Sequence, residues 1–575
     1  MDRLKHIVLS ALLISFGQIL TAQNLNSSTE LNRIDKNLNE SIYISTNAGS
    51  YLTGETLLYN LFCVDNNTQS TKTKSKTAYI QLVDSNKKSV FTHKIFLKDG
   101  TGNGDFFLPT TLESGNYKLI GYTKWMLNKE AENFFNIDLY ILNPYKEAPN
   151  QPILQTENTA SSPMTSSFIS FDLKNKTYSG RQEVSLAIKS ESADFLNGKY
   201  SLSVRKTDGF VIQNKNGFAQ TKNNRKDIVA ASFKNNDLIL PELRGELITG
   251  KITSSSADIK NKKIALSIVD KNSELKFTKT DDQGRFIFNL EKPNPSANIV
   301  VQVVEDNKED YTIEVEKDFS VDFSKLQFAN LQFNSDFKKN ITDRLVSSQI
   351  ENAYYNVKKD SIINLKNSFP FFGSLSTEFV LDDYTRFKTM AETITEVVKG
   401  VYFTKTKNNY SIHIFDNDPN YESTLPALVV VDGLVIEDLN ELFAYNPKNI
   451  EKVNAVKGIY YYGAKSFNGL LIYTSKEGNY DTKLKGRFIT RPQLLRPEMK
   501  KEYFRPDYST DKNDRIPDYR HQLLWSPNID IKNQKFSFYT SDISGQFEII
   551  LEGFSESGKS VYIKEFITVT DNTVN

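Results

Sequence analysis

Short apolar runs separated by turn residues follow one another from residue 40 to residue 123, and no helical period interrupts them. Each run is long enough for one strand, and the runs cover residues 42–45, 56–65, 78–84, 91–97 and 116–123. Several short strands at this spacing are typical of β-sandwiches. Aromatic residues make up 12% of the chain, which also favours pleated surfaces. The sequence therefore predicts a mainly β chain that begins with a sandwich over residues 40–147.

The same plan returns beyond a polar stretch. Residues 151–167 are rich in Ser, Thr and Pro, which is typical of a linker. After it, residues 178–184 echo the pattern of residues 51–57. An internal repeat of this kind indicates two related domains in tandem. We therefore predict a second sandwich over residues 168–240, in a chain whose 575 residues suit several domains.

The hairpin Tyr51-Leu52-Thr53-Gly54-Glu55 carries a first resemblance. Its Tyr-x-x-Gly-Glu pattern resembles the early hairpin of macroglobulin-like domains, which occur in α-macroglobulins and in many exported bacterial proteins. The protease-trap mechanism of α-macroglobulins uses a thioester built on a cysteine motif. The only cysteine here, Cys63, lies in an apolar run that predicts a buried strand thiol. The resemblance therefore implies tandem Ig-like, macroglobulin-like sandwiches without the trap chemistry.

A third unit begins near residue 241. An Asp281-Asp282-Gln283-Gly284 turn precedes the aromatic strand at residues 285–290, and this pattern resembles the carboxypeptidase-regulatory-like β-sandwich. Gly284 suits the turn because glycine takes positive φ without strain. The two aspartates could be calcium ligands, but an Asx turn that caps its own backbone is favoured. We predict this sandwich over residues 241–320.

Residues 335–355 and 387–398 carry a clear helical period, so an α+β module is predicted here. Within residues 425–476, five elements follow in order: Asp432-Gly433, Asn446-Pro447, Ile450-Glu451, Tyr462-Gly463 and Asn468-Gly469. This order resembles the plug domain of TonB-dependent outer-membrane receptors of the SusC-like type. The Asp-Gly and Asn-Gly pairs suit tight hairpins, so the stretch is scaffold first. The predicted plug-like α+β domain covers residues 335–480.

No receptor barrel is expected around this module. Too few residues follow Lys476 for the roughly twenty strands of such a barrel. Residues 481–575 again resemble macroglobulin-type strands, and we predict a C-terminal β-sandwich segment there. A plug-like domain without a barrel wall must cover its apolar surface with neighbouring domains or with another protein.

The first residues have the composition of an export signal. Arg3 and Lys5 precede an apolar run at residues 7–20, and small and polar residues follow, so residues 1–23 are predicted to be a signal peptide. The run is shorter than the roughly 20 apolar residues that span a bilayer, so no transmembrane helix is expected after signal removal. Lys and Arg total 71 against 70 Asp and Glu, which leaves no basic excess for nucleic acid.

Residue types that carry out catalysis are scattered. His93, His413 and His521 lie on three separate strand-like segments, without paired metal-ligand spacing. The acidic loop at residues 416–422 has a tyrosine where a calcium loop needs glycine, so a solvated loop is favoured. The sequence also lacks a Gly-x-Ser-x-Gly nucleophile elbow. We therefore predict no catalytic residue, no cofactor, no metal site and no enzyme activity.

The resemblances imply an exported, non-enzymatic interaction protein associated with the outer membrane, on its periplasmic or cell-surface side. We favour an accessory subunit of an outer-membrane β-barrel complex for import, export or barrel assembly. The alternative is a surface or periplasmic protein that binds a glycan or a peptide through its sandwich loops.

Two aromatic runs supply the candidate partner-binding residues, because Tyr and Phe concentrate binding energy at interfaces. They are Phe369, Phe371, Phe372, Tyr460, Tyr461 and Tyr462. Strand alternation sends at least one of the three tyrosines outward. The alternative interpretation has both runs buried between the plug-like module and its neighbours.

Overall fold

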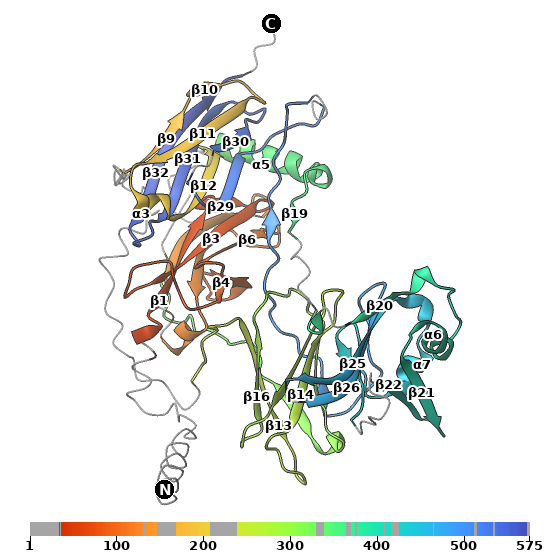
Figure 1. Ribbon diagram of the computed structural model, residues 1–575. Coiled ribbons are helices and arrows are strands. Elements are labelled where there is room, and N and C mark those ends of the chain that lie inside the picture. Colours follow the sequence, from red (N-terminus) through yellow and green to blue (C-terminus); the bar gives the residue numbers. More distant parts are fainter. Residues whose placement is uncertain are drawn as a thin grey trace, which may run out of the picture.

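The computed structural model describes residue 34 and residues 36–129, 131, 134–146, 168–207, 238–328, 338–363, 370–373, 376–407, 409–415, 425–463, 465–510, 515–532 and 535–571. These residues are mainly β and form three sandwiches and one α+β module (Figure 1). The predicted signal peptide, the predicted linker, Phe369 and the acidic loop at residues 416–422 lie outside the described residues. None of the helices within the described ranges is long and apolar enough to cross a membrane.

The first sandwich faces a sheet of three strands with a sheet of five. The smaller sheet contains β1 (Glu40–Thr46), β3 (Thr56–Asp65) and β6 (Thr101–Phe107); the larger contains β2 (Ser50–Leu52), β8 (Asn136–Leu142), β7 (Gly115–Tyr122), β4 (Thr77–Asp84) and β5 (Ser89–Phe96). Alternate residues of both sheets enter one core, among them Ile42, Leu61 and Ile80. Cys63 lies in the same core, where burial raises the pKa of its thiol.

The second sandwich is built from two segments that lie far apart in the sequence. The first segment supplies β9 (Ile169–Leu173), β10 (Thr177–Tyr178), β11 (Glu183–Ser190), the short helix α3 (Ala193–Leu196) and β12 (Lys199–Lys206); the second supplies β29 (Gln522–Ile529), β30 (Lys535–Tyr539), β31 (Gly545–Phe554) and β32 (Ser560–Val569). β12 lies between β29 and β31 in the sheet of five, and β11 lies between β30 and β9 in the sheet of three. Yellow and blue strands therefore share this sandwich in Figure 1.

The sequence analysis placed these segments in separate sandwiches, at residues 168–240 and 481–575, and this division is wrong. Ser201 and Glu552 are direct strand partners although they are 351 residues apart. Val204 likewise has a neighbour from the second segment on each side, so neither segment closes the core alone. Hairpin signals in a sequence report only neighbouring strands, and long-range pairing leaves no local pattern.

The third sandwich contains β16 (Arg285–Leu290), β13 (Glu246–Thr253) and β18 (Thr312–Val315) in one sheet, and β15 (Glu274–Lys279), β14 (Lys263–Ile268), β17 (Ile299–Val303) and β27 (Ile489–Thr490) in the other. Before β16, the Asp281 carboxylate accepts the backbone N–H groups of Gln283 and Arg285, at 2.8 Å each. Gly284 has a φ of +74°, and a Cβ there would lie 2.6 Å from the carbonyl oxygen of Ile252. Asp281 therefore caps its own turn.

The α+β module has a mixed sheet in the order β20 (Thr377–Val380), β25 (Ile450–Tyr462), β26 (Lys465–Ser475), β23 (Leu428–Val431) and β24 (Leu434–Val435). One face carries α6 (Met390–Val397), α7 (Leu439–Ala444) and the hairpin of β21 (Val401–Thr406) and β22 (Asn409–Ile414). The other face packs on β14 and β15 of the third sandwich. Val429 and Val431 lie on the face that carries the helices, and Val430 lies on the face that packs on the third sandwich. Burial on both faces explains the unbroken apolar run of β23.

The helix α5 (Lys338–Ala353) lies outside this module, although the sequence analysis started the plug-like domain at residue 335. α5 packs beside the first two sandwiches (Figure 1), and its buried residues are Arg344 and Ser347. This buried face is polar, so it lacks the apolar stripe of an ordinary core helix. A two-stranded ribbon follows, made of β19 (Ser361–Ile362) and β28 (Lys501–Glu502). Single 3-10 turns occupy Trp125–Asn128, Lys308–Asp310, Tyr355–Val357, Leu381–Asp383 and Pro447–Asn449.

Candidate interaction surface

One buried carboxylate holds the strand-turn-strand at residues 429–435. Asp432 has a φ of +50° and Gly433 a φ of +87°, so the chain reverses between β23 and β24 through the left-handed region. The Asp432 carboxylate accepts the backbone N–H of Ser475 at 2.7 Å, the Ser475 hydroxyl at 2.5 Å and the backbone N–H of Tyr480 at 3.0 Å. Donors of the chain itself bind both carboxylate oxygens of Asp432, so this strand-turn-strand has a structural role.

The three tyrosines at the end of β25 point to alternate faces. Tyr462 faces the third sandwich: its hydroxyl donates to the carbonyl of Leu275, and its ring packs edge-on to Phe277 at 5.8 Å. Burial raises the pKa of this hydroxyl. Tyr460 lies on the same face, whereas Tyr461 lies on the opposite face and is 76% exposed. The alternation therefore sends one tyrosine to solvent and two into a contact between domains.

The two described phenylalanines join this contact. The Phe371 ring stacks on Tyr462 with 4.6 Å between ring centroids, and the Phe371 carbonyl accepts the Tyr460 hydroxyl at 2.6 Å. Phe372 is buried and packs edge-on to Phe371 at 5.4 Å. Phe369 lies outside the described residues. The structure thus brings both phenylalanines together with the two inward tyrosines, and we call these four residues the interdomain aromatic cluster.

The three predicted histidines lie in three separate environments. The His93 ring shares a hydrogen bond of 2.8 Å with the Tyr59 hydroxyl, and burial lowers the pKa of His93 to about 4. The His521 ring lies 3.2 Å from the Ser347 hydroxyl of α5, and burial lowers the pKa of His521 to about 2. His413 is half-buried on β22. In the part of the chain that the structure describes, no three potential metal ligands come together.

A buried ion pair joins α5 to the hairpin that carries the Tyr-x-x-Gly-Glu pattern. The Arg344 guanidinium donates to both carboxylate oxygens of Glu55, at 2.6 and 2.7 Å, and to the carbonyl of Ser50 at 2.6 Å. The carbonyl of Gly54 accepts the side chain of Asn352 at 2.8 Å. Sequence analysis missed this contact, because the pattern marks the hairpin but carries no sign of the polar helix face that binds it.

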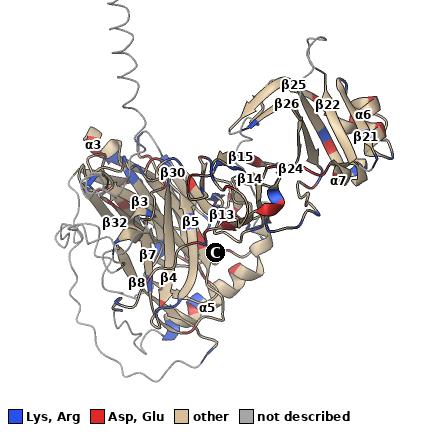
Figure 2. Cartoon of the chain, turned by 90° about the horizontal axis from the view of Figure 1, so that it is seen from below, with Lys and Arg blue, Asp and Glu red and all other residues tan. Residues whose placement is uncertain are grey.

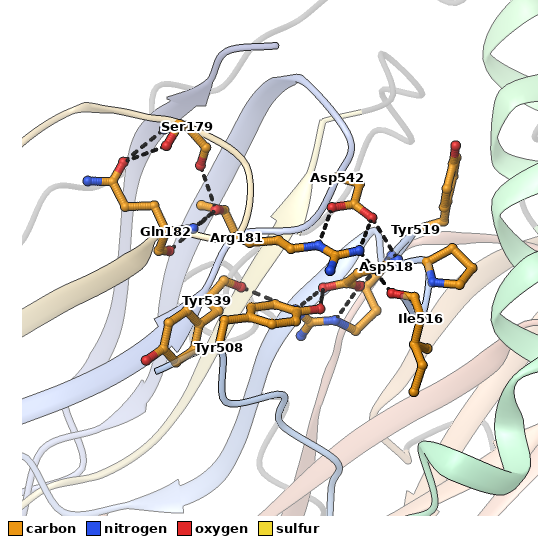
Figure 3. A network of polar contacts seen from close by, with 12 residues as sticks. Ser179, Arg181, Gln182, Tyr508, Ile516, Asp518, Tyr519, Tyr539 and Asp542 are labelled. Carbon is orange, nitrogen blue, oxygen red and sulfur yellow. Dashed lines mark hydrogen bonds and ion pairs between the residues drawn. The ribbon is translucent and has the colours of Figure 1, made fainter. Parts of the chain in front are cut away.

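The corresponding hairpin of the second sandwich holds a different ion pair (Figure 3). Arg181 donates to both carboxylate oxygens of Asp542, at 2.6 and 2.8 Å, and to the carbonyl of Ile516 at 2.9 Å. Its guanidinium lies 5.0 Å from the ring centre of Tyr508, whose hydroxyl donates to Asp518 at 2.8 Å. This network ties the first segment of the second sandwich to the chain that returns to it.

Charged side chains are also buried between the first and third sandwiches. Lys94 and Arg496 both contact Glu246, at 2.8 and 2.7 Å, and none of the three side chains is more than 5% exposed. A cavity of about 40 Å³ lies beside them, lined in part by Tyr79 and Tyr122. A cavity of this size has room for a few water molecules. The contact is best explained as a polar joint between two sandwiches.

The surface charge is mixed. In the view of Figure 2, basic and acidic residues are interspersed over the molecule, and the formal net charge of the chain is +1. A nearly neutral surface with both signs close together produces no strong long-range field.

Comparison with known proteins gives distant structural neighbours. No protein-family model matches the chain, and no curated protein matches it. Among solved structures, Salmonella alpha-2-macroglobulin reacted with methylamine aligns at 8% identity with a TM-score of 0.23, over 93% of this chain and 40% of that chain. The native conformation of E. coli alpha-2-macroglobulin aligns at 7% identity with a TM-score of 0.23, over 93% and 40%. The Yersinia pseudotuberculosis adhesin InvE aligns at 9% identity with a TM-score of 0.13, over 48% and 58%.

These neighbours are bacterial macroglobulin and adhesin structures. The chain spans about 40% of the length of the macroglobulins with which it aligns. At TM-scores this low, none of the alignments assigns a function to this chain.

Proposed function

We propose that this protein is an exported, non-enzymatic interaction protein that serves as an accessory subunit of an outer-membrane β-barrel complex. The plug-like module at residues 376–480 is its docking unit. The observation that carries the proposal is the position of Tyr461, which projects 76% exposed from a hairpin whose other face is fixed against the third sandwich. An aromatic side chain on a rigid support binds with little loss of conformational entropy.

The packing of the module supports docking outside a barrel lumen. Its sheet has helices of the module on one face and the third sandwich on the other, so these elements cover apolar surface that a barrel wall would otherwise cover. The hairpin at residues 459–468 also presents Ile459 beside Tyr461, and both are exposed. A small apolar anchor of this kind suits a contact with another folded protein.

Co-purification with native outer membranes in mild detergent tests the proposal. Tyr461→Ser should reduce recovery of the barrel partner by about tenfold or more, with an unchanged melting temperature. The matched control is Tyr402→Ser, which removes another exposed tyrosine of the same module. Undiminished recovery with Tyr461→Ser, or equal losses with both variants, would rule out docking through this hairpin.

The interdomain aromatic cluster gives a second variant with the opposite signature. Phe371→Ser removes a ring that stacks on Tyr462 between two domains. We expect a lower melting temperature, and loss of the partner only in proportion to unfolding. A binding defect at full stability would move the docking site to this cluster.

A glycan-binding surface protein is the second candidate function. It is favoured by the exposed rings of Tyr402 on β21 and Phe415 just after β22, whose centroids lie 4.7 Å apart. Fractionation separates the two candidates. Recovery of a stoichiometric barrel partner supports the accessory subunit. A free protein that a glycan column retains, and whose retention is lost in the Tyr402→Ser variant, supports the alternative.

A further inference from the structure

A buried lysine of the first sandwich contacts an amide and a carboxylate at once. The Nζ of Lys118 donates to the Oδ1 of Asn136 at 2.9 Å and lies 2.8 Å from the Oδ1 of Asp138. Lys118 lies on β7, and both partners lie on β8, where Asp138 is the direct strand partner of Lys118. The three side chains therefore share one face of the five-stranded sheet.

The contacts of Asn136 determine the direction of its amide. The Nδ2 of Asn136 donates to the backbone carbonyl of Phe134 at 3.0 Å. A carbonyl only accepts and an ammonium group only donates, so the amide oxygen must face Lys118. The amide carbon next to this oxygen is therefore held beside the Nζ of Lys118. Two groups held together in this way react far faster than the same groups free in solution.

Apolar residues keep water from this lysine. Lys118 is 6% exposed. Its partner on β4 is Val83, and the next residue on the same face of β7 is Ile120; both are fully buried. The ring of Phe328 lies over the Nζ, with 5.8 Å between the nitrogen and the ring centre. Only a neutral amine is a nucleophile, and the carboxylate of Asp138 is in position to take the proton from the ammonium group.

We propose that Lys118 and Asn136 join in an isopeptide bond within the folded chain, with Asp138 as the group that transfers the protons. Asp138 takes a proton from Nζ, and the neutral amine attacks the amide carbon of Asn136, so that a bond forms between Nζ and Cγ. The bond between Cγ and Nδ2 then breaks. Two protons pass from Nζ to Nδ2 by way of the carboxylate, Nδ2 leaves as ammonium, and Asp138 returns to its starting state. The step consumes no other reactant.

The bond would close a covalent ring around the loop between β7 and β8. This loop holds the first sandwich to the third: Lys124 donates to the carbonyl of Leu247 at 3.3 Å, and Asn128 donates to the carbonyl of Ile239 at 2.9 Å. Closing a ring restricts the unfolded chain and so favours the folded loop. One cysteine cannot form a disulfide within this chain, and an isopeptide bond supplies a cross-link of another kind.

Mass spectrometry of the unchanged full chain tests the proposal, and it does not depend on the folding of a variant. We expect nearly every molecule to lack the mass of one ammonia relative to its sequence. Trypsin should release one branched peptide that joins residues 99–124 to residues 130–146, because a modified Lys118 is not cleaved. An unchanged mass would overturn the proposal. So would a loss of ammonia with normal cleavage after Lys118, which indicates cyclisation of an asparagine.

Two variants and a matched control assign the roles. Lys118→Arg keeps the positive charge but lacks the nucleophile, so its mass should equal the value calculated from its sequence. Asp138→Asn keeps the size of the side chain without the proton acceptor, and we expect the same result. The control is Asp172→Asn, which removes an exposed carboxylate beside Lys189 and should leave the bond intact. A complete bond in the Asp138→Asn chain, or its loss in the control chain, would contradict the role of Asp138.

The site lies in the first sandwich, so this inference is independent of the role proposed for Tyr461. The Tyr461→Ser chain should form the bond as completely as the unchanged chain, and a chain without the bond would contradict this independence.

Discussion

Arg181 in the second sandwich occupies the backbone position that Gly54 occupies in the first. Both have positive φ, +55° for Arg181 and +93° for Gly54. The side chain that follows, Glu55 or Gln182, accepts the backbone N–H three residues earlier at 2.9 Å in both hairpins. The two sandwiches therefore share a turn and differ in what it binds. The first turn binds a helix, and the second binds a returning loop.

Position 181 should accept glycine better than alanine once the arginine side chain is removed. Arg181→Gly and Arg181→Ala both remove the ion pair with Asp542, but alanine stays in a conformation that suits glycine. We expect the glycine variant to be more stable than the alanine variant by about 1 kcal/mol in urea denaturation. Equal stabilities would show that the positive φ relaxes once the guanidinium is gone.

Removing only one partner of the ion pair between Arg344 and Glu55 should lower the stability of the fold strongly. Glu55→Ala leaves a guanidinium that is 1% exposed without its carboxylate, so the free energy of unfolding should fall by about 3 kcal/mol or more. The double variant Glu55→Leu with Arg344→Met should recover part of that loss. Glu113→Ala, which breaks an exposed pair with Lys146, serves as the control and should change stability by about 0.5 kcal/mol or less.

Acid should weaken the fold through His93. Burial lowers the pKa of His93 to about 4, while the unfolded chain keeps the ordinary value of 6.5. As the pH falls, the unfolded chain binds the His93 proton before the folded chain does. The contribution of neutral His93 to the free energy of unfolding is therefore complete above about pH 6.5 and is lost towards pH 4. The loss is about 1.4 kcal/mol per pH unit within that window. His93→Gln should flatten the pH dependence of urea denaturation, and an identical slope would contradict the assignment.

Asp432 should behave as a structural residue. Asp432→Asn tolerates the positive φ of +50° but has one acceptor oxygen in place of two, so bonds to Ser475 or Tyr480 are lost. We expect a decrease of about 2 kcal/mol in the free energy of unfolding, measured in urea. Recovery of the proposed barrel partner should be unchanged at temperatures where the variant is folded. A selective loss of the partner would give this carboxylate a role in binding.

Turn chemistry was the part of the fold that the sequence could predict, with one exception. Asn468-Gly469 was expected to close a tight hairpin, but it lies inside β26, next to a register shift in the pairing with β25. Asp281 and Gly284 form the expected Asx turn, and Asp432 with Gly433 reverses the chain as expected, because each turn is determined by residues adjacent in sequence. The alternation of Tyr460, Tyr461 and Tyr462 was predictable for the same reason. Which face would meet a neighbouring domain was not, since the third sandwich lies far earlier in the chain.

The helix α5 shows why the remaining features were hidden. An apolar face was expected, yet Arg344 and Ser347 are its buried residues. A polar face becomes buried only where a partner offers matching groups, here Glu55 and the backbone of its hairpin.

The split second sandwich imposes an order of events on folding. Tyr200, Leu202 and Val204 of β12 are fully buried between β29 and β31. A chain that is synthesised from its N-terminal end presents β12 long before these two strands. Throughout that interval β12 has both edges bare, while the first sandwich can already fold and the third can be completed once β27 arrives. A chaperone that holds unpaired strands would therefore find its target in residues 168–207, and release from it would coincide with the arrival of β29–β32.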